Sequence, residues 1–300
     1  MEHVKVLLST FNGERYLNEQ IESIINQVGV KVDLLVRDDG SSDKTREILS
    51  EWERKGYLTW YDGPNMKPAN SFLDLIFHAS PDVQFYAFCD QDDVWDKDKL
   101  KIAVEYIKNR DSNKPSLYYS KLNPVNESLQ PINVNYRKGK DSLGRAMLVS
   151  YAAGCTMVFD RELFTLARKY KPKDIRMHDH WIYLICIAVG GNIIFDTLPH
   201  IKYRQHSNNS VGYKAGKFKQ ILRLWESFSH GNRERSKQII ELNRGYSKYI
   251  TEQNLALVNR VINYGNSWKD KFQLIFDKDI KTGSIKNNVL LIIAIVTNRF

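Results

Sequence analysis

Residues 84–100 read QFYAFCDQDDVWDKDKL, and this stretch decides the fold. Its run of five apolar residues, FYAFC, predicts a buried strand. Three carboxylates then follow within four positions, at Asp90, Asp92 and Asp93. The residues over 98–109 have the apolar spacing of a helix. A buried strand that ends in an acidic loop and leads into a helix is typical of the edge of an α/β sheet where ligands bind.

The chain before this stretch repeats the same alternation of short apolar runs and helical patterns. Strands are predicted at 4–9, 32–36 and 58–61, and helices at 14–27, 42–55 and 69–79. This alternation indicates right-handed crossovers and a mostly parallel sheet with helices on both faces, so the fold class is α/β. Ligands of such sheets bind at the carboxyl ends of the strands, which points to three loops. These loops are 9–15, 38–43 and 90–95.

Beyond residue 110 the pattern is less regular. Residues 111–140 are rich in Asn, Pro and Ser, with one predicted strand at 117–120. The later predicted elements are a strand at 155–159, a helix from 161, a helix at 178–189, and strands at 192–195 and 201–204. After Gly212 the pattern is helical to the end. We therefore expect a main domain over 1–212, with halves 1–110 and 111–212, and a helical extension over 213–300.

Charge is spread unevenly along the chain. The net charge is +9, yet residues 1–110 carry 14 Lys+Arg against 20 Asp+Glu, and residues 201–300 carry 18 against 7. The basic third indicates an anionic partner, such as a membrane surface, a phosphate-linked acceptor or a nucleic acid, or else a solvated helical face. Because no known nucleic-acid motif occurs, we expect no nucleic-acid partner.

Composition also bears on the compartment. Three cysteines are too few for a disulfide scaffold and fit buried thiols in a reducing compartment. No signal peptide is recognisable at the start of the chain. The longest apolar run, 289–296, is less than half of the roughly 20 residues that a spanning helix needs. We therefore expect a cytoplasmic protein.

The acidic loop at 90–93 is the sharpest chemical feature. Carboxylates this close repel one another unless a cation compensates them. Hard divalent cations such as Mg²⁺ prefer oxygen ligands, and they are commonly held by one or two carboxylates together with substrate phosphates. The loop therefore predicts a divalent-cation site. The alternative is a solvated acidic loop that caps the helix at 98.

The other two loops carry groups suited to a nucleotide. In RDDGSSD at 37–43, a carboxylate can accept the imide N–H of uracil or thymine, and Gly40 permits a sharp turn. The alternative is a turn that caps the next helix. In the first loop, Phe11 can stack on a base. No GxGxxG or GxxxxGK[ST] occurs, which argues against a dinucleotide fold and a P-loop.

Two later motifs complete the set of candidates. HDHW at 178–181 opens an apolar helix, where Asp179 can serve as a general base. The alternative is a helix cap. The strand before 205 ends in Arg204, which can offset phosphate charge, and His206, which can ligate a metal as a neutral imidazole. The alternative for His206 is a structural or exposed histidine.

These features, in this order, resemble the family-2 inverting glycosyltransferases of the GT-A fold. The motifs that carry the resemblance are STFNGERYL at 9–17, RDDGSSD at 37–43, CDQDDVWDKDKL at 89–100, AAGCTMVFDREL at 152–163, HDHW at 178–181 and YRQHSNNSVG at 203–212. DQDDVW and the last two motifs look most like bacterial rhamnosyltransferases that build cell-wall, capsular or O-antigen polysaccharides from dTDP-L-rhamnose. The resemblance implies a GT-A fold, with a nucleotide-sugar-binding half over 1–110 and an acceptor-binding half over 111–212.

The resemblance also implies roles for single residues. Asp179 would be the catalytic base, and Asp90, Asp92 and His206 would hold Mg²⁺ or Mn²⁺. The donor-binding residues would be Ser9, Thr10, Phe11, Glu14, Asp38, Asp39, Lys67, Asn70, Asp90, Gln91 and Arg204. The donor would be a dTDP- or UDP-sugar, and the acceptor a polyprenyl-diphosphate-linked glycan. Transfer of galactose, glucose or GlcNAc from a UDP-sugar is the alternative to rhamnose.

Other classes of protein fit less well. A nucleotidyltransferase usually carries a Gly-rich, basic phosphate loop near its N-terminus, where this chain has STFNGERYL. A non-catalytic glycosyltransferase-like binding subunit is a second alternative, and the intact Asp39, Asp90, Asp92 and Asp179 argue against it. The processive synthase signature QxxRW is absent, which argues against a chitin- or cellulose-type polymerase.

The tail has a pattern of its own. Phe218, Ile221, Leu222, Trp225 and Phe228 fall at helical spacing, with Lys217, Lys219 and Arg223 among them. This pattern is typical of an interfacial helix with an aromatic and a basic face. It equally fits a helix that packs on the main domain or on a second subunit. We therefore expect either peripheral contact with the inner face of the cell membrane or a homodimer through the C-terminal helices.

Overall fold

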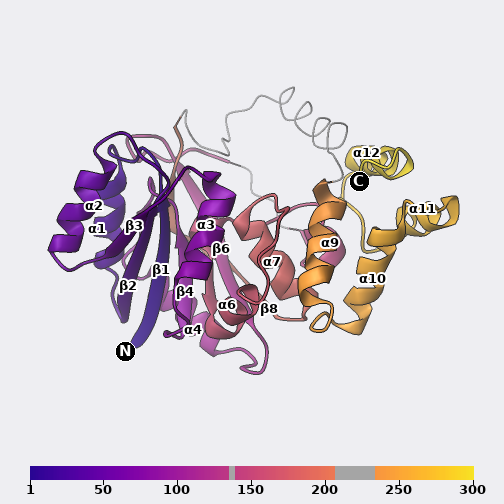
Figure 1. Cartoon of the computed structure of the whole chain (residues 1–300), viewed down its shortest axis with the longest axis horizontal. Coiled ribbons are helices and arrows are strands. Elements are labelled where there is room, and N and C mark those ends of the chain that lie inside the picture. Colours follow the sequence, from indigo (N-terminus) through magenta and orange to yellow (C-terminus); the bar gives the residue numbers. More distant parts are fainter. Residues whose placement is uncertain (135–138, 207–233) are drawn as a thin grey trace.

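The computed structural model describes residues 1–134, 139–206 and 234–300. Its central feature is an eight-stranded sheet with the strand order β3-β2-β1-β4-β7-β6-β8-β5 (Figure 1). The strands are β1 (Glu2–Thr10), β2 (Val30–Asp38), β3 (Thr59–Asp62), β4 (Phe85–Cys89), β5 (Val94–Trp95), β6 (Ser116–Val125), β7 (Val158–Asp160) and β8 (Asn192–Arg204).

The first four long strands form a parallel half-sheet. β1 pairs in parallel with both β2 and β4, and β2 pairs in parallel with β3. The other half is mixed, because β7 runs antiparallel to β4 and β6, β5 runs antiparallel to β8, and β6 and β8 are parallel. The predicted mostly parallel α/β sheet is therefore confirmed. Since β1, β2 and β4 run the same way, their carboxyl ends meet at one edge.

Helices cover both faces of the sheet, as the alternation predicts. The described helices are α1 (Leu17–Ile25), α2 (Thr45–Arg54), α3 (Lys67–His78), α4 (Lys99–Lys108), α5 (Leu143–Ala146), α6 (Arg161–Ala167), α7 (His178–Ala188), α9 (Glu234–Tyr246), α10 (Glu252–Asn263), α11 (Trp268–Ile275) and α12 (Ile285–Val296). Successive residues of β1 enter opposite cores, because side chains alternate along a strand. Leu7 packs in the core of α3, α6 and α7, whereas Val6 and Leu8 pack in the core of α1 and α4.

The C-terminal helices extend the first of these cores. Ile239 and Leu242 of α9 and Leu257 of α10 are buried in the same cluster as α7. Tyr246 of α9 lies with its ring centroid 5.9 Å from that of Trp181 on α7. The helices after residue 234 are thus joined to α7 by a continuous apolar core. The expected boundary at 212/213 falls outside the described residues.

Three predicted strands differ from the structure. The strand predicted at 155–159 is a short 3-10 helix, Gly154–Thr156, followed by β7, because the carbonyls of Ala153 and Gly154 accept turn hydrogen bonds. The strands predicted at 192–195 and 201–204 are one continuous strand, β8. Irregularities in its pairing with β6, beside Ser120 and Lys121, accommodate the polar residues and the proline between its two halves.

The expected interfacial helix over 213–228 also lies outside the described residues. Across the described ranges, every helix is too short or too polar to span a bilayer.

The shared core makes a prediction about stability. Leu242 is fully buried, so Leu242→Ala should lower the free energy of unfolding by about 2–5 kcal/mol, measured by urea denaturation. Lys237→Ala is a control on the exposed face of the same helix and should change the free energy by less than about 0.5 kcal/mol. A loss below about 1 kcal/mol for Leu242→Ala would show that α9 is not part of the cooperative core.

Candidate functional site

The loops that follow β1, β2 and β4 are joined by direct hydrogen bonds. The Gln91 Oε1 atom accepts hydrogen bonds from the Thr10 hydroxyl at 2.6 Å and from the Phe11 N–H at 2.8 Å. The Asn12 N–H donates to the Ser41 hydroxyl at 2.8 Å. The expectation that these loops meet at one edge of the sheet is therefore confirmed. Thr10 and Gln91 hold each other, and Phe11 remains 43% exposed beside them.

The contacts of Gly13 and Glu14 explain why these residue types stand in the first loop. A Cβ at Gly13 would lie 2.6 Å from the Gln91 Oε1 atom, so a larger residue there would displace Gln91 from its hydrogen bonds with Thr10 and Phe11. Glu14 is held by the start of α2. Its N–H donates to Asp43 at 3.1 Å, and its carboxylate accepts from the Lys44 N–H at 3.0 Å. These contacts fix the loop against the Asp38–Asp43 loop before any ligand binds.

Asp38 and Asp39 are both buried, and both accept hydrogen bonds from the protein. Asp38 accepts from the Ser41 N–H at 2.9 Å and from the Arg46 Nε atom at 3.0 Å. It therefore closes the turn at Gly40, whose φ of +85° confirms the predicted sharp turn.

Asp39 joins the second loop to the start of α3. Its carboxylate accepts from the N–H groups of Met66 at 2.9 Å and Lys67 at 3.0 Å, and it forms an ion pair with Arg37. A carboxylate has about four acceptor positions, and these described contacts use three. The side chains of Lys67 and Asn70 are exposed in the first turn of α3, beside this carboxylate.

Arg37 is a site residue that sequence reasoning missed. It is 1% exposed at the end of β2 and also pairs with Asp74, with Nε and Oδ2 at 3.0 Å. Its guanidinium donates to the Ser71 hydroxyl at 3.1 Å, and that hydroxyl lies 2.6 Å from the hydroxyl of Ser9. The position of Arg37 directly after the apolar run of a buried strand was the sequence feature that pointed to this role, because a charged side chain buried there needs partners.

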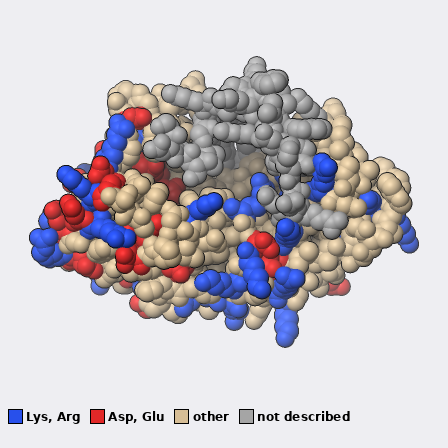
Figure 2. Space-filling model, turned by 45° about the horizontal axis from the view of Figure 1, so that its top comes forward, with Lys and Arg blue, Asp and Glu red and all other residues tan. Residues whose placement is uncertain are grey.

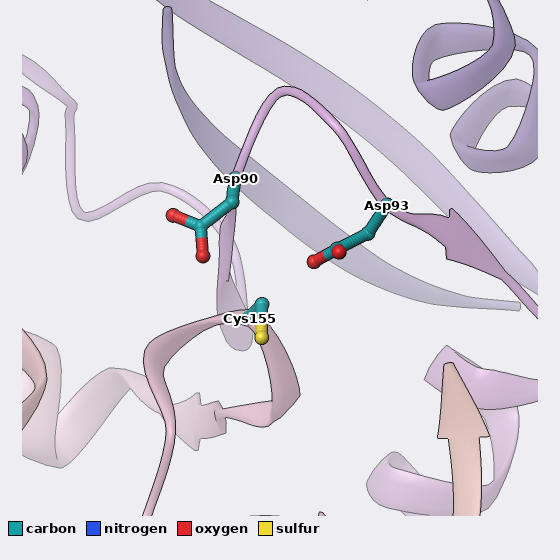
Figure 3. Close-up of side chains that lie close together, drawn as sticks. All are labelled: Asp90, Asp93 and Cys155. Carbon is teal, nitrogen blue, oxygen red and sulfur yellow. The ribbon is translucent and has the colours of Figure 1, made fainter. Parts of the chain in front are cut away.

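The acidic loop brings carboxylates together beneath the sheet edge. Oxygen atoms of Asp90 and Asp93 and the sulfur of Cys155 all lie within 4.8 Å of one another (Figure 3). Burial and the charges of Asp92 and Asp179 raise the pKa of Asp90 to about 7. Burial and the charges of Asp92 and Asp90 also raise the pKa of Asp93 well above its usual range. Within the described ranges, the buried Asp93 Oδ2 atom has no hydrogen-bond partner.

Arg204 holds this loop from the end of β8. The Arg204 N–H donates to Asp93 at 3.0 Å, and its Nε atom donates to the carbonyl of Asp92 at 2.8 Å. The rest of the guanidinium donates to the carbonyl of Glu127 and to the carboxylate of Glu19. Glu19 and Glu127 were not expected from the sequence. Arg204 is 3% exposed, and these contacts direct its guanidinium toward the protein.

Asp179 lies in the first turn of α7, as predicted, and next to the acidic loop. Its carboxylate accepts from the Gly154 N–H at 3.0 Å and from the His180 N–H at 2.6 Å. Met177 occupies the cap position of α7, so Asp179 is not the helix cap. Burial raises the pKa of Asp179 to about 6, and its charge raises the pKa of Asp90. The structure therefore brings together carboxylates that are about 90 residues apart in the sequence.

With this geometry established, the chain can be compared with known proteins. The sequence model of the family described as Glycosyl transferase family 2 matches residues 5–166, more than half of the chain. The chain belongs to glycosyltransferase family 2. The match covers all three loops and the acidic cluster, so the predicted family and enzyme class are confirmed.

Named relatives of this family-2 glycosyltransferase include two bacterial enzymes. The chain is 28% identical to the dTDP-rhamnosyl transferase RfbG of Shigella flexneri, over 71% of this chain and 78% of the relative. It is 26% identical to WfgD of Escherichia coli, named as a UDP-Glc:alpha-D-GlcNAc-diphosphoundecaprenol beta-1,3-glucosyltransferase, over 74% of this chain and 84% of the relative.

Solved structures support the GT-A fold. Staphylococcus aureus TarS 1–349 in complex with UDP-GlcNAc superposes with a TM-score of 0.57 at 17% identity, over 98% of this chain and 79% of TarS. The mannosyltransferase PcManGT of Pyrobaculum calidifontis, in complex with GDP-Man and Mn²⁺, has a TM-score of 0.53 at 16% identity, over 98% of this chain and 86% of that enzyme.

The glycosyltransferase site contains a donor set suited to a hard divalent cation. The His206 Nε2 atom lies 2.7 Å from the Asp92 Oδ2 atom, and Asp90 is close enough for the Asp92 charge to raise its pKa. Of the predicted ligands, Asp92 and His206 are in direct contact, whereas Asp90 groups within 4.8 Å with Asp93 and Cys155. Cys155 is a poorer candidate because burial raises its pKa well above the usual range, and a neutral thiol binds hard cations weakly.

Lys99 is a second residue that sequence reasoning missed. It is 1% exposed, and its Nζ atom lies 3.3 Å from the centroid of the Trp95 ring. Burial lowers its pKa to about 8, and the nearby carboxylate of Asp93 opposes this shift. The signal was its position four residues before Ala103 on the apolar face of α4. Lys99 therefore places a cation beneath the acidic loop.

Two substitutions distinguish the possible cation ligands. Asp92→Ala should weaken Mn²⁺-dependent binding of dTDP or UDP by at least about tenfold, measured by isothermal titration calorimetry, because it removes a ligand. Cys155→Ser is the matched control in the same cluster and should leave that affinity unchanged. The reverse result would assign the cation to the group formed by Asp90, Asp93 and Cys155.

Proposed function

We propose that this enzyme transfers L-rhamnose from dTDP-L-rhamnose to a polyprenyl-diphosphate-linked glycan during the synthesis of a cell-surface polysaccharide, with inversion at the anomeric carbon. The observation that carries the proposal is that Asp179, on α7, accepts a hydrogen bond from the N–H of Gly154, and that the next residue, Cys155, lies within 4.8 Å of Asp90 and Asp93 in the acidic loop after β4. A carboxylate with a raised pKa beside a group of carboxylates suited to a cation provides a base next to a site for a diphosphate. The similarity to RfbG favours rhamnose as the sugar.

The donor half of the proposal rests on the edge formed by the first three loops. Phe11 is exposed there and offers an aromatic face to a base. The described contacts of the Asp39 carboxylate use three of its about four acceptor positions. The remaining position can accept a hydrogen bond from the imide N–H of a pyrimidine base. Lys67 and Asn70 are exposed at the start of α3 and can reach phosphate or ribose oxygens. Ser9, Thr10, Glu14, Asp38 and Gln91 then act mainly by holding these loops.

The reaction is a single displacement. Asp179 takes the proton of an acceptor hydroxyl, whose oxygen forms a bond to the anomeric carbon. The bond from that carbon to the diphosphate oxygen breaks, and the diphosphate leaves with the electron pair. Mg²⁺ or Mn²⁺ held by Asp90, Asp92 and His206 would stabilise the negative charge that develops on the leaving group. Arg204 keeps the acidic loop in place through the carbonyl of Asp92.

A UDP-hexose donor is the second candidate, and the similarity to WfgD favours it. In both cases the base is a pyrimidine, so the contacts proposed for Phe11 and Asp39 are the same. The two candidates differ in the transferred sugar, in the 5-methyl group of the base and in the 2′-hydroxyl of the ribose. They are therefore separated by the donor that the protein binds and uses.

The proposed base leads to a prediction about pH. Asp179 has a pKa of about 6, and only its ionised form can accept a proton, so kcat/KM should fall about tenfold per pH unit as pH drops below about 6. Asp179→Asn should lower kcat by about 10²–10⁴-fold and leave the Kd for the donor nearly unchanged. The measurements are pH profiles of sugar transfer and calorimetric titration with the nucleotide sugar.

Asp160→Asn is a matched control for this prediction. Burial also raises the pKa of Asp160 to about 6, but Asp160 pairs with Phe85, at the opposite end of β4 from Asp90. The Asp160→Asn variant should therefore have an unchanged kcat and should show the same fall of kcat/KM at low pH as the unmodified enzyme. If Asp179→Asn retains transfer within about tenfold of the unmodified enzyme, Asp179 is not the base.

Donor identity is tested with a panel of nucleotide sugars. With Mn²⁺ present, dTDP-L-rhamnose should raise Tm most, because a ligand that binds the folded state stabilises it more the tighter it binds at a given concentration. UDP-glucose, UDP-galactose and UDP-GlcNAc should raise Tm less. The enzyme should then hydrolyse or transfer the sugar of the donor that binds best. A larger shift and faster turnover with a UDP-sugar would replace rhamnose with that hexose.

A further inference from the structure

We propose that an exposed apolar face on the last two helices docks onto a bilayer surface that carries anionic headgroups. This C-terminal apolar face consists of Trp268, Phe272, Phe276, Ile285, Val289, Ile292 and Ile293. The three aromatic side chains are 62%, 54% and 74% exposed, and Ile285 is 86% exposed. Contiguous exposed apolar patches of this kind mark sites that contact another apolar phase or partner.

Within each helix the exposed apolar residues recur at helical spacing. Trp268 and Phe272 lie on α11 and Phe276 directly follows it, with ring centroids 6.3 Å and 6.5 Å apart along the row. On α12, positions 285, 289, 292 and 293 share one face. The other sides of these helices bury Leu274 and Leu291 in the core. Both helices are therefore apolar on two sides, and the described part of the chain buries only one of them.

Charge around this face favours an anionic partner. Exposed cations lie along the same segment at Lys269, Lys278, Lys281 and Arg299. Residues 264–300 hold six Lys+Arg against three Asp+Glu, and α12 contains no carboxylate. Of the three acids, Asp277 is ion-paired with Arg260 at 2.8 Å. The end of the molecule that holds α11 is mostly uncharged surface with blue side chains at its margin (Figures 1 and 2).

This combination fits a lipid surface better than a second copy of the chain. In a symmetric dimer each patch meets itself, so the basic margins of the two faces would repel each other. Anionic headgroups would attract those margins while Trp and Phe enter the interfacial region. No helix in the described ranges can span a bilayer, so the contact would be shallow. The inference does not depend on the identity of the donor sugar or the acceptor.

The test uses the full chain and vesicles without substrate. Flotation with phosphatidylglycerol-containing vesicles should recover the protein, and vesicles of phosphatidylcholine alone or high salt should recover much less. The triple variant Trp268→Ser, Phe272→Ser, Phe276→Ser should lower the bound fraction at least about tenfold, because binding scales with the apolar area buried. Circular dichroism and donor-induced Tm shifts should show that this variant is folded.

A matched control carries three equally drastic changes on other surfaces. Val28, Tyr57 and Leu198 are 48%, 51% and 63% exposed, and the triple variant Val28→Ser, Tyr57→Ser, Leu198→Ser should float like the unmodified protein. Equal flotation of the Trp268, Phe272 and Phe276 variant would overturn the proposal. The proposal would also be overturned if sedimentation velocity showed a dimer of the unmodified protein and a monomer of this variant, and if the unmodified protein did not bind anionic vesicles. Asp179→Asn should not change flotation, so failure of the proposed transfer reaction and failure of docking are separate results.

Discussion

The site depends on one electrostatic constraint, the crowding of carboxylates at the end of β4. Asp90, Asp92 and Asp93 follow a fully buried strand, and Asp179 approaches them from α7. The protein supplies cations nearby but does not use them to neutralise the cluster. Lys99 lies against Trp95, and Arg204 binds carbonyls and Glu19. Burial and the repulsion between carboxylates raise the pKa values of Asp90 and Asp93, and a divalent cation would relieve that repulsion.

A second constraint fixes the loops before a donor arrives. Arg37 is held between Asp39 and Asp74, and Asp39 in turn anchors the start of α3 through backbone N–H groups. Gln91 performs the same task between β1 and the acidic loop. Such prior ordering reduces the entropy that donor binding must overcome. The polar residues of the three loops therefore divide into those that build the site and those left exposed to meet a ligand, such as Phe11.

The sequence predicted the sheet, its helices and the meeting of the three loops, because short apolar runs and helical spacing are local signals. It also predicted that Asp179 would lie in the first turn of a helix. It did not predict that Arg204 would be enclosed by Glu19 and Glu127, since these partners come from α1 and from the loop after β6. The sequence also did not predict that the Cys155 sulfur would lie near Asp93, because a cysteine beside an apolar run is usually an ordinary core residue. Long-range pairing of polar groups leaves no periodic trace in the sequence.

The C-terminal helices connect the proposed base to the proposed docking face. Trp181, two residues after Asp179, packs against Tyr246 of α9, and the same apolar core continues into Leu274 and Leu291. Removing these helices would therefore uncover α7 and disturb Asp179 along with the exposed face. A truncated protein would lose membrane contact and the correct position of Asp179 together, so the two effects could not be separated. Substitution of the exposed aromatic side chains leaves that core in place, so it alone can show whether the outer face of these helices has a function separate from supporting α7.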